Sequence, residues 1–365
     1  MGRAAKAIVY REGGPIAMEP IDVAPPKRDE ITLKLAACGV CHSDLSATNG
    51  TVRMPPPLVL GHEGFGSVVE VGEGVAGFKV GDAVLTSFAR MCGKCAACVS
   101  GHPARCEHAA EAFSTLPDGT VRTHDAKGEP LNVFCGLGAM AEYATIHVDN
   151  AIKVDAHGIP PASAAIVSCA VMTGVGSVTN TAKVEPGSRV AVFGLGGVGL
   201  NAVQGAVLAG AATIVAVDTN ADKLAAAKRF GATDVVNAKE EDMVKAVRRL
   251  GRVDYGFECV GSGELVSQAY KCLAPGGTLV IVGVAPGKDQ ATFTPISMAM
   301  EERCIRGSTY GSARPQKDIP ALLALYRGGR LKLDEMVTRT YSIDQGPQAF
   351  DDLKAGRNLR GVIVF

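Results

Sequence analysis

Four cysteines lie within fifteen residues of one another, separated by two, two and seven residues. They are Cys92, Cys95, Cys98 and Cys106. Four thiolates at this spacing are typical of a closed, tetrahedral site for a structural zinc ion. The surrounding lobe, residues 90–107, holds few apolar residues, so the metal would supply much of its folding energy. Because four thiolates leave no coordination position open, catalysis must take place elsewhere. Disulfides and a nucleic-acid-binding zinc module are the alternatives.

A glycine-rich segment, GLGGVG, predicts a dinucleotide site. It follows an apolar run, residues 189–193, and precedes a helical pattern that ends near residue 209. In this motif the first glycine permits a tight turn, the second lets backbone approach a pyrophosphate, and the third lets helix and strand pack closely. The pyrophosphate would bind the free N–H groups at the start of the helix. The residues concerned are Gly194, Gly196, Gly197, Val198 and Gly199.

Asp218 ends the next apolar run, 19 residues after Gly199. An acidic residue at this distance accepts hydrogen bonds from both hydroxyls of the adenosine ribose and repels a 2′-phosphate. The sequence therefore predicts NAD rather than NADP, with Asn220 and Lys223 close to the same ribose. The alternative for Asp218 is a turn or helix-capping residue.

A third set of metal-ligating residue types is scattered along the chain. Cys41 to Asp44 read CHSD, His62 and Glu63 follow a glycine, and Cys169 lies far along the sequence. Taken singly, a cysteine or histidine is more often a packed core residue than a metal ligand.

The elements that must position these residues change in character near residue 170. Short β-prone runs divided by glycine and proline predict a mostly antiparallel β domain in the first part of the chain. They cover residues 7–10, 30–36, 66–71, 83–87 and 142–147. Buried strands then alternate with helices, which predicts a parallel, doubly wound sheet. These segments are 189–193, 213–217, 223–230, 253–258, 265–273 and 278–284. Two helices, near 319–326 and 348–355, and a strand at 361–365 complete the chain. The fold class is therefore α/β, with domain boundaries after residues 170 and 308.

Composition excludes several classes of protein. The 365 residues carry 37 basic and 37 acidic side chains and no basic run, which argues against nucleic acid as a partner. The longest purely apolar stretch, residues 279–285, is far short of the roughly 18 needed to span a bilayer. No secretory signal is recognised, so we expect a cytoplasmic protein without a membrane partner. In that reducing compartment, 11 cysteines indicate metal ligands rather than disulfides.

The chain resembles the zinc-dependent alcohol dehydrogenases of the medium-chain dehydrogenase/reductase superfamily. The resemblance spans essentially the whole chain and rests on AACGVCHSD, GHEGFGSVVEVGEGV, CGKCAACVSGHPARC, GLGGVG with Asp218, and LRGVIVF. The stretch between Cys106 and Glu142 resembles the loop of the dimeric long-chain branch, which includes the liver-type and class III enzymes. The resemblance implies a GroES-like catalytic domain (residues 1–170, completed by 309–365) and a Rossmann coenzyme domain (171–308). It further implies an active site in the cleft between them, and a homodimer.

Residue by residue, the resemblance implies a catalytic zinc on Cys41, His62 and Cys169, with a fourth position open, hence two zinc ions per chain. Glu63 matches a carboxylate near the metal, and Asp44 one that orients the His62 ring. Zinc would activate the oxygen of a small alcohol, and hydride would pass to NAD.

The proton path departs from the family pattern. Ser43 matches the hydroxyl that bonds the substrate oxygen, but the histidine that ends the relay in many members falls on Ser46. A serine is no base near neutral pH, so we expect the proton to leave through water or a neighbouring group. His42 and Arg360 match contacts to the cofactor pyrophosphate, and Thr173 matches a residue beside the nicotinamide.

Four apolar residues match positions that line the substrate site, and the last also borders the cofactor. They are Val52, Phe88, Phe134 and Val284, which favour medium-chain or aryl primary alcohols; all four could instead be ordinary core. A glutathione-dependent formaldehyde dehydrogenase should carry a basic residue near residues 111–116, and EAFSTL has none. A nicotinoprotein, which retains its NAD through turnover, is a further alternative that the sequence does not exclude. A non-enzymatic scaffold would be expected to lose the open-site ligands.

Overall fold

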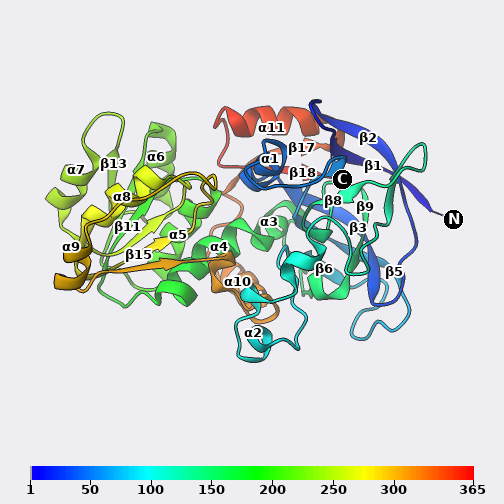
Figure 1. Cartoon of the computed structure of the whole chain (residues 1–365), viewed down its shortest axis with the longest axis horizontal. Helices are drawn as coiled ribbons and strands as arrows, with labels where there is room; N and C mark the ends of the chain where they lie inside the picture. Colours follow the sequence, from blue (N-terminus) through cyan, green and yellow to red (C-terminus); the bar gives the residue numbers. More distant parts are fainter. Residues whose placement is uncertain (1) are drawn as a thin grey trace. The chain divides into compact units, whose positions relative to one another are not determined.

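The computed structural model describes residues 2–365, which form two compact units (Figure 1). The first comprises the residues up to Cys169 together with Arg314–Phe365, and the second is Ala170–Ala313. The second boundary lies five residues beyond the expected one, because the 3-10 helix Tyr310–Ser312 belongs to the second unit. There the Asn180 side chain donates to the carbonyl of Gly311 (3.4 Å), and the hydroxyls of Thr181 and Ser312 lie 2.8 Å apart.

The first unit is built from two sheets whose strands pair mostly antiparallel, as expected. One sheet has the order β7-β2-β1-β4-β8, and the other β10-β6-β5-β3-β18-β17 with β9 also paired to β3. The strands are β1 Arg3–Tyr10, β2 Ile16–Val23, β3 Glu30–Gly39, β4 Leu58–Val59, β5 Glu63–Val71, β6 Ala83–Thr86, β7 Thr123–Asp125, β8 Asn132–Val133, β9 Tyr143–His147, β10 Ala151–Lys153, β17 Val337–Ser342 and β18 Arg360–Val364. The helices are α1 His42–Thr48, α2 Ala96–Val99, α3 Pro161–Ala165, α10 Pro315–Arg327 and α11 Gly346–Lys354.

Strand β3 is the centre of this unit. Its alternate residues Ile31, Leu33 and Leu35 are buried in the main apolar core, which explains why this segment forms a strand with a fixed register. Antiparallel pairing sets Gly39, at the end of β3, opposite Glu63, at the start of β5. Pairing with β18 sets Val362 opposite Gly39 as well. Segments far apart in sequence therefore meet at one end of β3.

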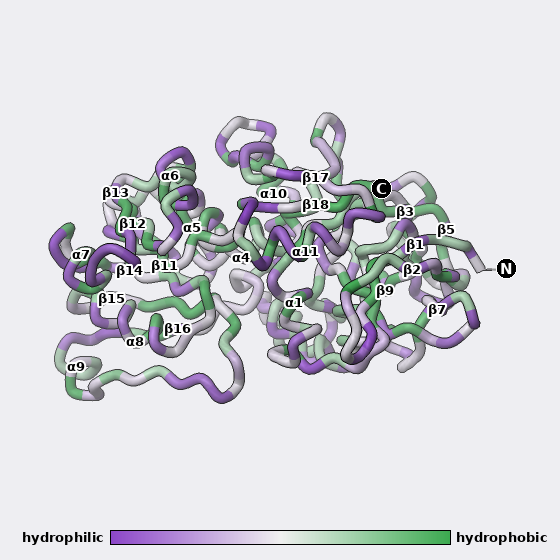
Figure 2. The backbone as a smooth tube through the Cα atoms, turned by 90° about the horizontal axis from the view of Figure 1, so that it is seen from above, coloured by the Kyte–Doolittle hydropathy of each residue, from purple (hydrophilic) through white to green (hydrophobic). Residues whose placement is uncertain are grey.

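The second unit is a six-stranded parallel sheet of order β13-β12-β11-β14-β15-β16, as the alternating pattern predicts. Its strands are β11 Arg189–Phe193, β12 Thr213–Asp218, β13 Asp234–Asn237, β14 Val253–Glu258, β15 Leu273–Ile281 and β16 Cys304–Gly307. Its helices are α4 Ala170–Gly176, α5 Gly197–Leu208, α6 Ala221–Arg229, α7 Met243–Leu250, α8 Gly263–Cys272 and α9 Pro295–Met300. Figure 2 colours much of α6 and α7 hydrophilic, as helices with one face in solvent should be. Strand order reverses between β11 and β14, and ligands of such sheets bind at that point.

Within residues 2–365, no single helix is long and apolar enough to cross a membrane. Two consecutive apolar helical segments, 161–168 and 170–182, reach that length only when they are joined across a break.

Candidate active site

The register of β3, β5 and the segment before Cys169 brings three metal-ligating residues together. Cys41 follows the end of β3 and is the N-cap of α1, and His62 directly precedes β5. The Ser168 hydroxyl donates to the carbonyl of Gly64 in β5 (3.3 Å), which ties the neighbouring Cys169 to the same place. All three belong to the first unit.

The donor atoms of Cys41, His62, Glu63 and Cys169 lie within 4.8 Å of one another, and all four residues are buried. Nδ1 of His62 lies 3.3 Å from Oδ1 of the buried Asp44, which also accepts the N–H of Gly61 (2.9 Å). Nε2 of His62 is buried and has no hydrogen-bond partner among the described residues. An imidazole held at one nitrogen and unpartnered at the other, beside two thiols, fits zinc.

The electrostatics of this cluster favour the ligand form at Cys41, whereas the hydrogen bond with Cys41, together with burial, raises the pKa of the Cys169 thiol well above its usual range. A hydrogen bond from Cys169, together with His62 and Arg360, lowers the pKa of the Cys41 thiol well below its usual range despite burial. The thiolate is the form that binds metal. Burial lowers the pKa of His62, but Asp44 and Cys41 more than offset it, so the pKa is raised in the metal-free chain. A metal would therefore displace a proton from this ring.

Glu63 and Arg360 form a buried ion pair beside the metal ligands. Arg360 begins β18 and is 5% exposed, and its Nη2 donates to Oε2 of Glu63, which is 0% exposed. Burial raises the pKa of Glu63 to about 7, opposed by the Arg360 charge. A Cβ on Gly39 would lie 2.0 Å from Oε2 of Glu63, so glycine is required there. The pairing was not foreseen, and a pyrophosphate contact for Arg360 stays a prediction.

The four-cysteine lobe also gathers as its spacing predicts. The sulfur atoms of Cys92, Cys95, Cys98 and Cys106 lie within 4.8 Å of one another, and none is in a disulfide. The N–H of Cys95 donates to Sγ of Cys92 (3.3 Å), and that of Cys98 donates to Sγ of Cys95 (3.5 Å). Backbone hydrogen bonds from Cys98 and Glu107 lower the pKa of Cys95 to about 6. This set fits a closed structural zinc.

Helix α1 carries the residues expected to handle the proton. Oγ of Ser43 lies 3.6 Å from Sγ of Cys41, next to the metal ligands. Ser46, one turn later, is half-buried, and its carbonyl accepts the N–H of Val52 (2.9 Å). His42, the first residue of the helix, is exposed.

Aromatic rings flank His62. The rings of Phe88 and Phe134 meet it edge to face, with centroids 5.9 and 5.3 Å away. Phe113, which the sequence did not single out, meets Phe134 with centroids 6.0 Å apart. It is the single aromatic residue of the 111–116 segment, EAFSTL, and that is the signal the sequence offered. Val52 is half-buried against the same core.

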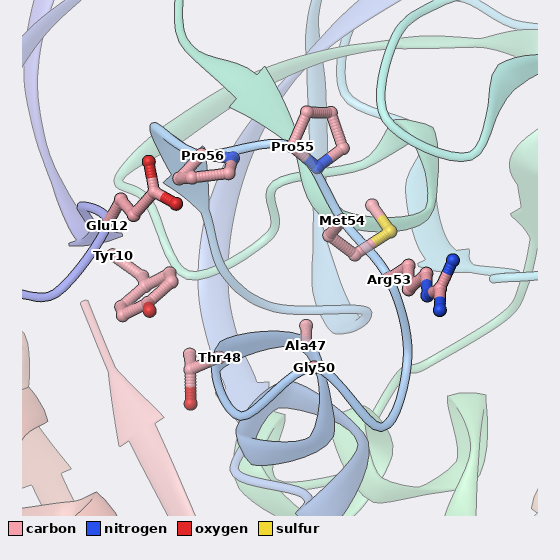
Figure 3. A pocket seen from close by; sticks show the side chains of 9 residues that line it. All are labelled: Tyr10, Glu12, Ala47, Thr48, Gly50, Arg53, Met54, Pro55 and Pro56. Atoms are coloured by element: carbon pink, nitrogen blue, oxygen red, sulfur yellow. The ribbon is translucent and has the colours of Figure 1, made fainter. Parts of the chain in front are cut away.

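A hollow of about 400 Å³ lies elsewhere on the first unit. It is lined by Tyr10, Glu12, Ala47, Thr48, Gly50, Arg53, Met54, Pro55 and Pro56. Glu12 and Arg53 stand on opposite sides of it (Figure 3). None of the four expected substrate-lining residues is among those that line it.

The glycine-rich turn of the second unit has the geometry of a dinucleotide cradle. Gly194 has φ +89°, and a Cβ on Gly199 would lie 1.8 Å from the carbonyl oxygen of Gly194. A Cβ on Gly196 would meet nothing within 4 Å, so its backbone is open to a ligand. Helix α5 begins at Gly197 without a side-chain cap, which leaves its first N–H groups, including that of Val198, without an intrahelical acceptor. These features fit a pyrophosphate.

The Asp218 carboxylate holds this turn from the next strand. Its Oδ2 accepts the N–H of Leu195 (2.7 Å), and its Oδ1 accepts those of Thr219 (2.8 Å) and Asn220 (2.9 Å). The turn-residue alternative is thus realised, and because three of the roughly four acceptor positions of a carboxylate are occupied, about one remains for a ribose hydroxyl. The Asn220 side chain in turn caps α6 by accepting the N–H of Lys223 (3.3 Å).

Two expected cofactor neighbours lie apart from the turn in sequence. Thr173 is on α4, and its buried hydroxyl has no partner among the described residues. Val284 is 63% exposed and lies three residues beyond the end of β15, which begins at Leu273 and ends three residues before the predicted run 278–284 does.

Comparisons with known proteins agree with this geometry. Residues 27–156 match the alcohol dehydrogenase GroES-like domain, and residues 197–327 match the zinc-binding dehydrogenase family. A Mycobacterium tuberculosis protein, provisionally named alcohol dehydrogenase D, is 38% identical over 98% of both chains. A solved alcohol dehydrogenase zinc-binding domain protein from Burkholderia ambifaria is 37% identical, with a TM-score of 0.95 over 100% of both chains. Benzyl alcohol dehydrogenase from Acinetobacter calcoaceticus is 32% identical, with a TM-score of 0.93 over 100% of this chain and 99% of that one. The chain therefore belongs to the zinc-binding dehydrogenases of the medium-chain dehydrogenase/reductase superfamily, with a GroES-like and a Rossmann-like domain, and is an oxidoreductase of the alcohol dehydrogenase type.

Proposed function

We propose that this protein is an NAD-dependent zinc alcohol dehydrogenase that interconverts primary aryl or medium-chain alcohols and their aldehydes. The main support is the buried convergence of Cys41, His62 and Cys169, with Nε2 of His62 unpartnered. The fourth nearby donor is Glu63, whose carboxylate is already paired with Arg360. Two thiolates and one imidazole therefore leave a coordination position for a substrate oxygen, as a catalytic site requires.

The chain's own groups prepare this site. When bound, zinc supplies a Lewis acid that lowers the pKa of the alcohol, and NAD supplies the hydride acceptor. Asp44 accepts the Nδ1 proton of His62 and so fixes the tautomer whose Nε2 lone pair faces the metal. The low pKa of the Cys41 thiol keeps a second ligand in its anionic form.

Ser43 is the first proton acceptor in this proposal. Its hydroxyl stands beside the ligand Cys41, so it can take the proton of the alcohol as it passes its own onward. Ser46 follows on the same helix but is not a base near neutral pH. The proton then leaves through water.

The aromatic residues near His62 favour an aryl substrate. Phe88 and Phe134 present edges to the imidazole, and Phe113 extends the apolar surface. An apolar wall excludes water from the reacting atoms and gives edge-to-face contacts to a ring. The similarity to a benzyl alcohol dehydrogenase supports the same choice.

The choice of NAD rests on Asp218. A 2′-phosphate near this carboxylate would meet a negative charge, and the loop after β12 together with the first turn of α6 offers one cation, Lys223, rather than an arginine cluster. The helix N-terminus at Gly197 is open for the pyrophosphate.

One assay tests the proposal. Purified protein is analysed for zinc and then mixed with ethanol, hexanol, benzyl alcohol or a terpene alcohol, with NAD, NADP or no added cofactor. We expect two zinc ions per chain and NADH formation that is fastest with benzyl alcohol or hexanol. Turnover with an artificial acceptor but without added NAD would indicate a retained cofactor. Three results would contradict the proposal: a preference for formaldehyde with glutathione, a preference for NADP over NAD, or no oxidation of any alcohol.

A further inference from the structure

A fully buried acidic residue ends the central strand β14 of the second unit. Glu258 pairs with Phe193, the residue just before Gly194, and on its other side with Ile281. It therefore stands at the carboxyl edge of the sheet, where strand order reverses between β11 and β14. This is the place where sheets of this kind bind dinucleotides.

Glu258 ties together the two loops that follow β14 and β15. Its side-chain Oε1 accepts the N–H groups of Val260 (2.8 Å) and Gly261 (2.7 Å). Its backbone carbonyl accepts those of Val282 (2.9 Å) and Gly283 (3.0 Å). One residue thus accepts four N–H groups, two from each of these loops.

The loops held in this way are pressed directly against the glycine-rich turn. A Cβ on Gly194 would lie 2.3 Å from Cγ2 of Val260. A Cβ on Gly261 would lie 2.5 Å from the carbonyl oxygen of Val284, and one on Gly283 would lie 2.1 Å from the N of Gly261. No side chain can stand between these segments. The exposed Val260 therefore owes its position beside the turn, and the exposed Val284 its position beside Gly261, to the groups that Glu258 holds.

Packing alone does not account for an acidic residue here. Oε2 of Glu258 is buried without a partner among the described residues, and burying a polar atom in that state is costly. Burial also raises the pKa of this carboxyl group. A leucine would fill a similar volume without that cost but could not accept the two N–H groups. Only the acid, or its amide, supplies an oxygen that accepts the N–H groups of Val260 and Gly261.

We infer that Glu258 is a positioning residue of the dinucleotide site, which holds Val260 against Gly194 and Gly261 against Val284 so that the wall of the crevice is formed before the cofactor arrives. The inference rests on the proposed use of NAD. The glycine-rich turn and Asp218 lie on one side of the point where strand order reverses. Glu258 supports the cofactor crevice from the other side. Pre-formed walls bind more tightly because less ordering is needed on binding.

Dinucleotide affinity tests this directly. NADH binding is measured by fluorescence titration for wild type, Glu258→Gln and Glu258→Leu, each with its Tm. The amide keeps an oxygen acceptor, so Glu258→Gln should bind NADH within about threefold of wild type. Glu258→Leu leaves two partly buried N–H groups without their acceptor, and its Kd should rise about tenfold or more. The rate of hydride transfer in a single turnover at saturating NAD should fall by a much smaller factor than the affinity for NADH. Should Glu258→Leu fail to fold, Glu258→Asp, one methylene shorter, takes its place.

Val247→Ala is the matched control, because Val247 is buried on α7 in the same unit and lies in no cofactor segment. It should lower Tm without changing the Kd for NADH. Unchanged affinity in Glu258→Leu, or equal losses of affinity in Glu258→Leu and Val247→Ala at equal loss of Tm, would overturn the inference alone. A wild-type protein that binds neither NADH nor NADPH would overturn the proposed function and this inference with it.

Discussion

Oδ1 of Asp44 lies 3.3 Å from Nδ1 of His62, and both side chains are almost completely buried. The same oxygen accepts the N–H of Gly61, so the carboxylate also holds the turn that leads into His62. The imidazole is therefore fixed in both orientation and tautomer by a residue that need not touch the metal.

Replacing Asp44 should weaken the catalytic zinc and leave the other zinc in place. Asp44→Ala removes the acceptor for Nδ1, and losses of this kind typically cost about 10- to 100-fold in metal affinity. Competition with a chromophoric chelator measures the change. The four-cysteine set is an internal control in the same chain, and equal loss of zinc from both sets would contradict the prediction.

One cysteine set should be needed for folding and the other for turnover. Cys98→Ser opens the closed set, whose lobe has a small core of its own, so folded yield and Tm should both fall. Cys169→Ser should keep the fold and Tm close to wild type and abolish turnover, with zinc falling from two to one per chain. Thermal unfolding and metal analysis check both variants. Equal loss of fold in both would contradict the assignment of closed and open sites.

The sequence predicted local features well and distant pairings poorly. Arg189–Phe193 is a strand with the expected ends, because a strand buried on both faces is a continuous apolar run. Strand β13 was missed, because four residues, DVVN, are too short to show a period. The candidate ligands Cys41, His62 and Cys169 could be grouped only through the family resemblance, because strand register and the hydrogen bond from Ser168 to Gly64 bring them together from distant parts of the chain. Glu63 and Arg360 are 297 residues apart, and no local pattern could have joined them.

Changing Asp218 should alter cofactor preference and also loosen the turn. Asp218→Gly removes the charge that opposes a 2′-phosphate, so the ratio of kcat/KM for NADP to that for NAD should rise. It also removes the acceptor for the N–H of Leu195, so KM for NAD should rise and Tm should fall slightly. Asp218→Asn keeps an oxygen acceptor and should change preference with a smaller loss of Tm. An unchanged preference in both variants would place the ribose contact on another residue.

Acid stability should depend on Asp352 of α11. Hydrogen bonds from Tyr341 and Arg357, with Gln348 and Arg339 also donating, lower its pKa to about 2. The unfolded chain has a pKa near 3.9 for this group, so its contribution is complete above that pH and is lost as the pH falls toward 2. Asp352→Asn should therefore be less stable than wild type at neutral pH, and the gap should narrow below about pH 4. Urea midpoints of both proteins across this range measure it, and a constant gap would contradict the assignment.

The proton path gives the sharpest prediction for catalysis. Ser46 lies one helical turn after Ser43 on α1, which puts both on one face of the helix. Ser46→His would add a base to that face, and general acid–base catalysis typically contributes about 10²- to 10⁴-fold. We expect a few-fold rise near pH 7, since water already serves the wild-type exit, and a smaller rise near pH 9, where hydroxide removes the proton readily. Slow NADH release could mask the change in kcat, so the rate is measured in a single turnover. Ser46→Asn, which adds bulk without a base, is the control. A single-turnover rate near pH 7 that is flat or lower in Ser46→His, with the fold intact, would mean that the proton leaves by another route, and His42 would then be the first residue to replace.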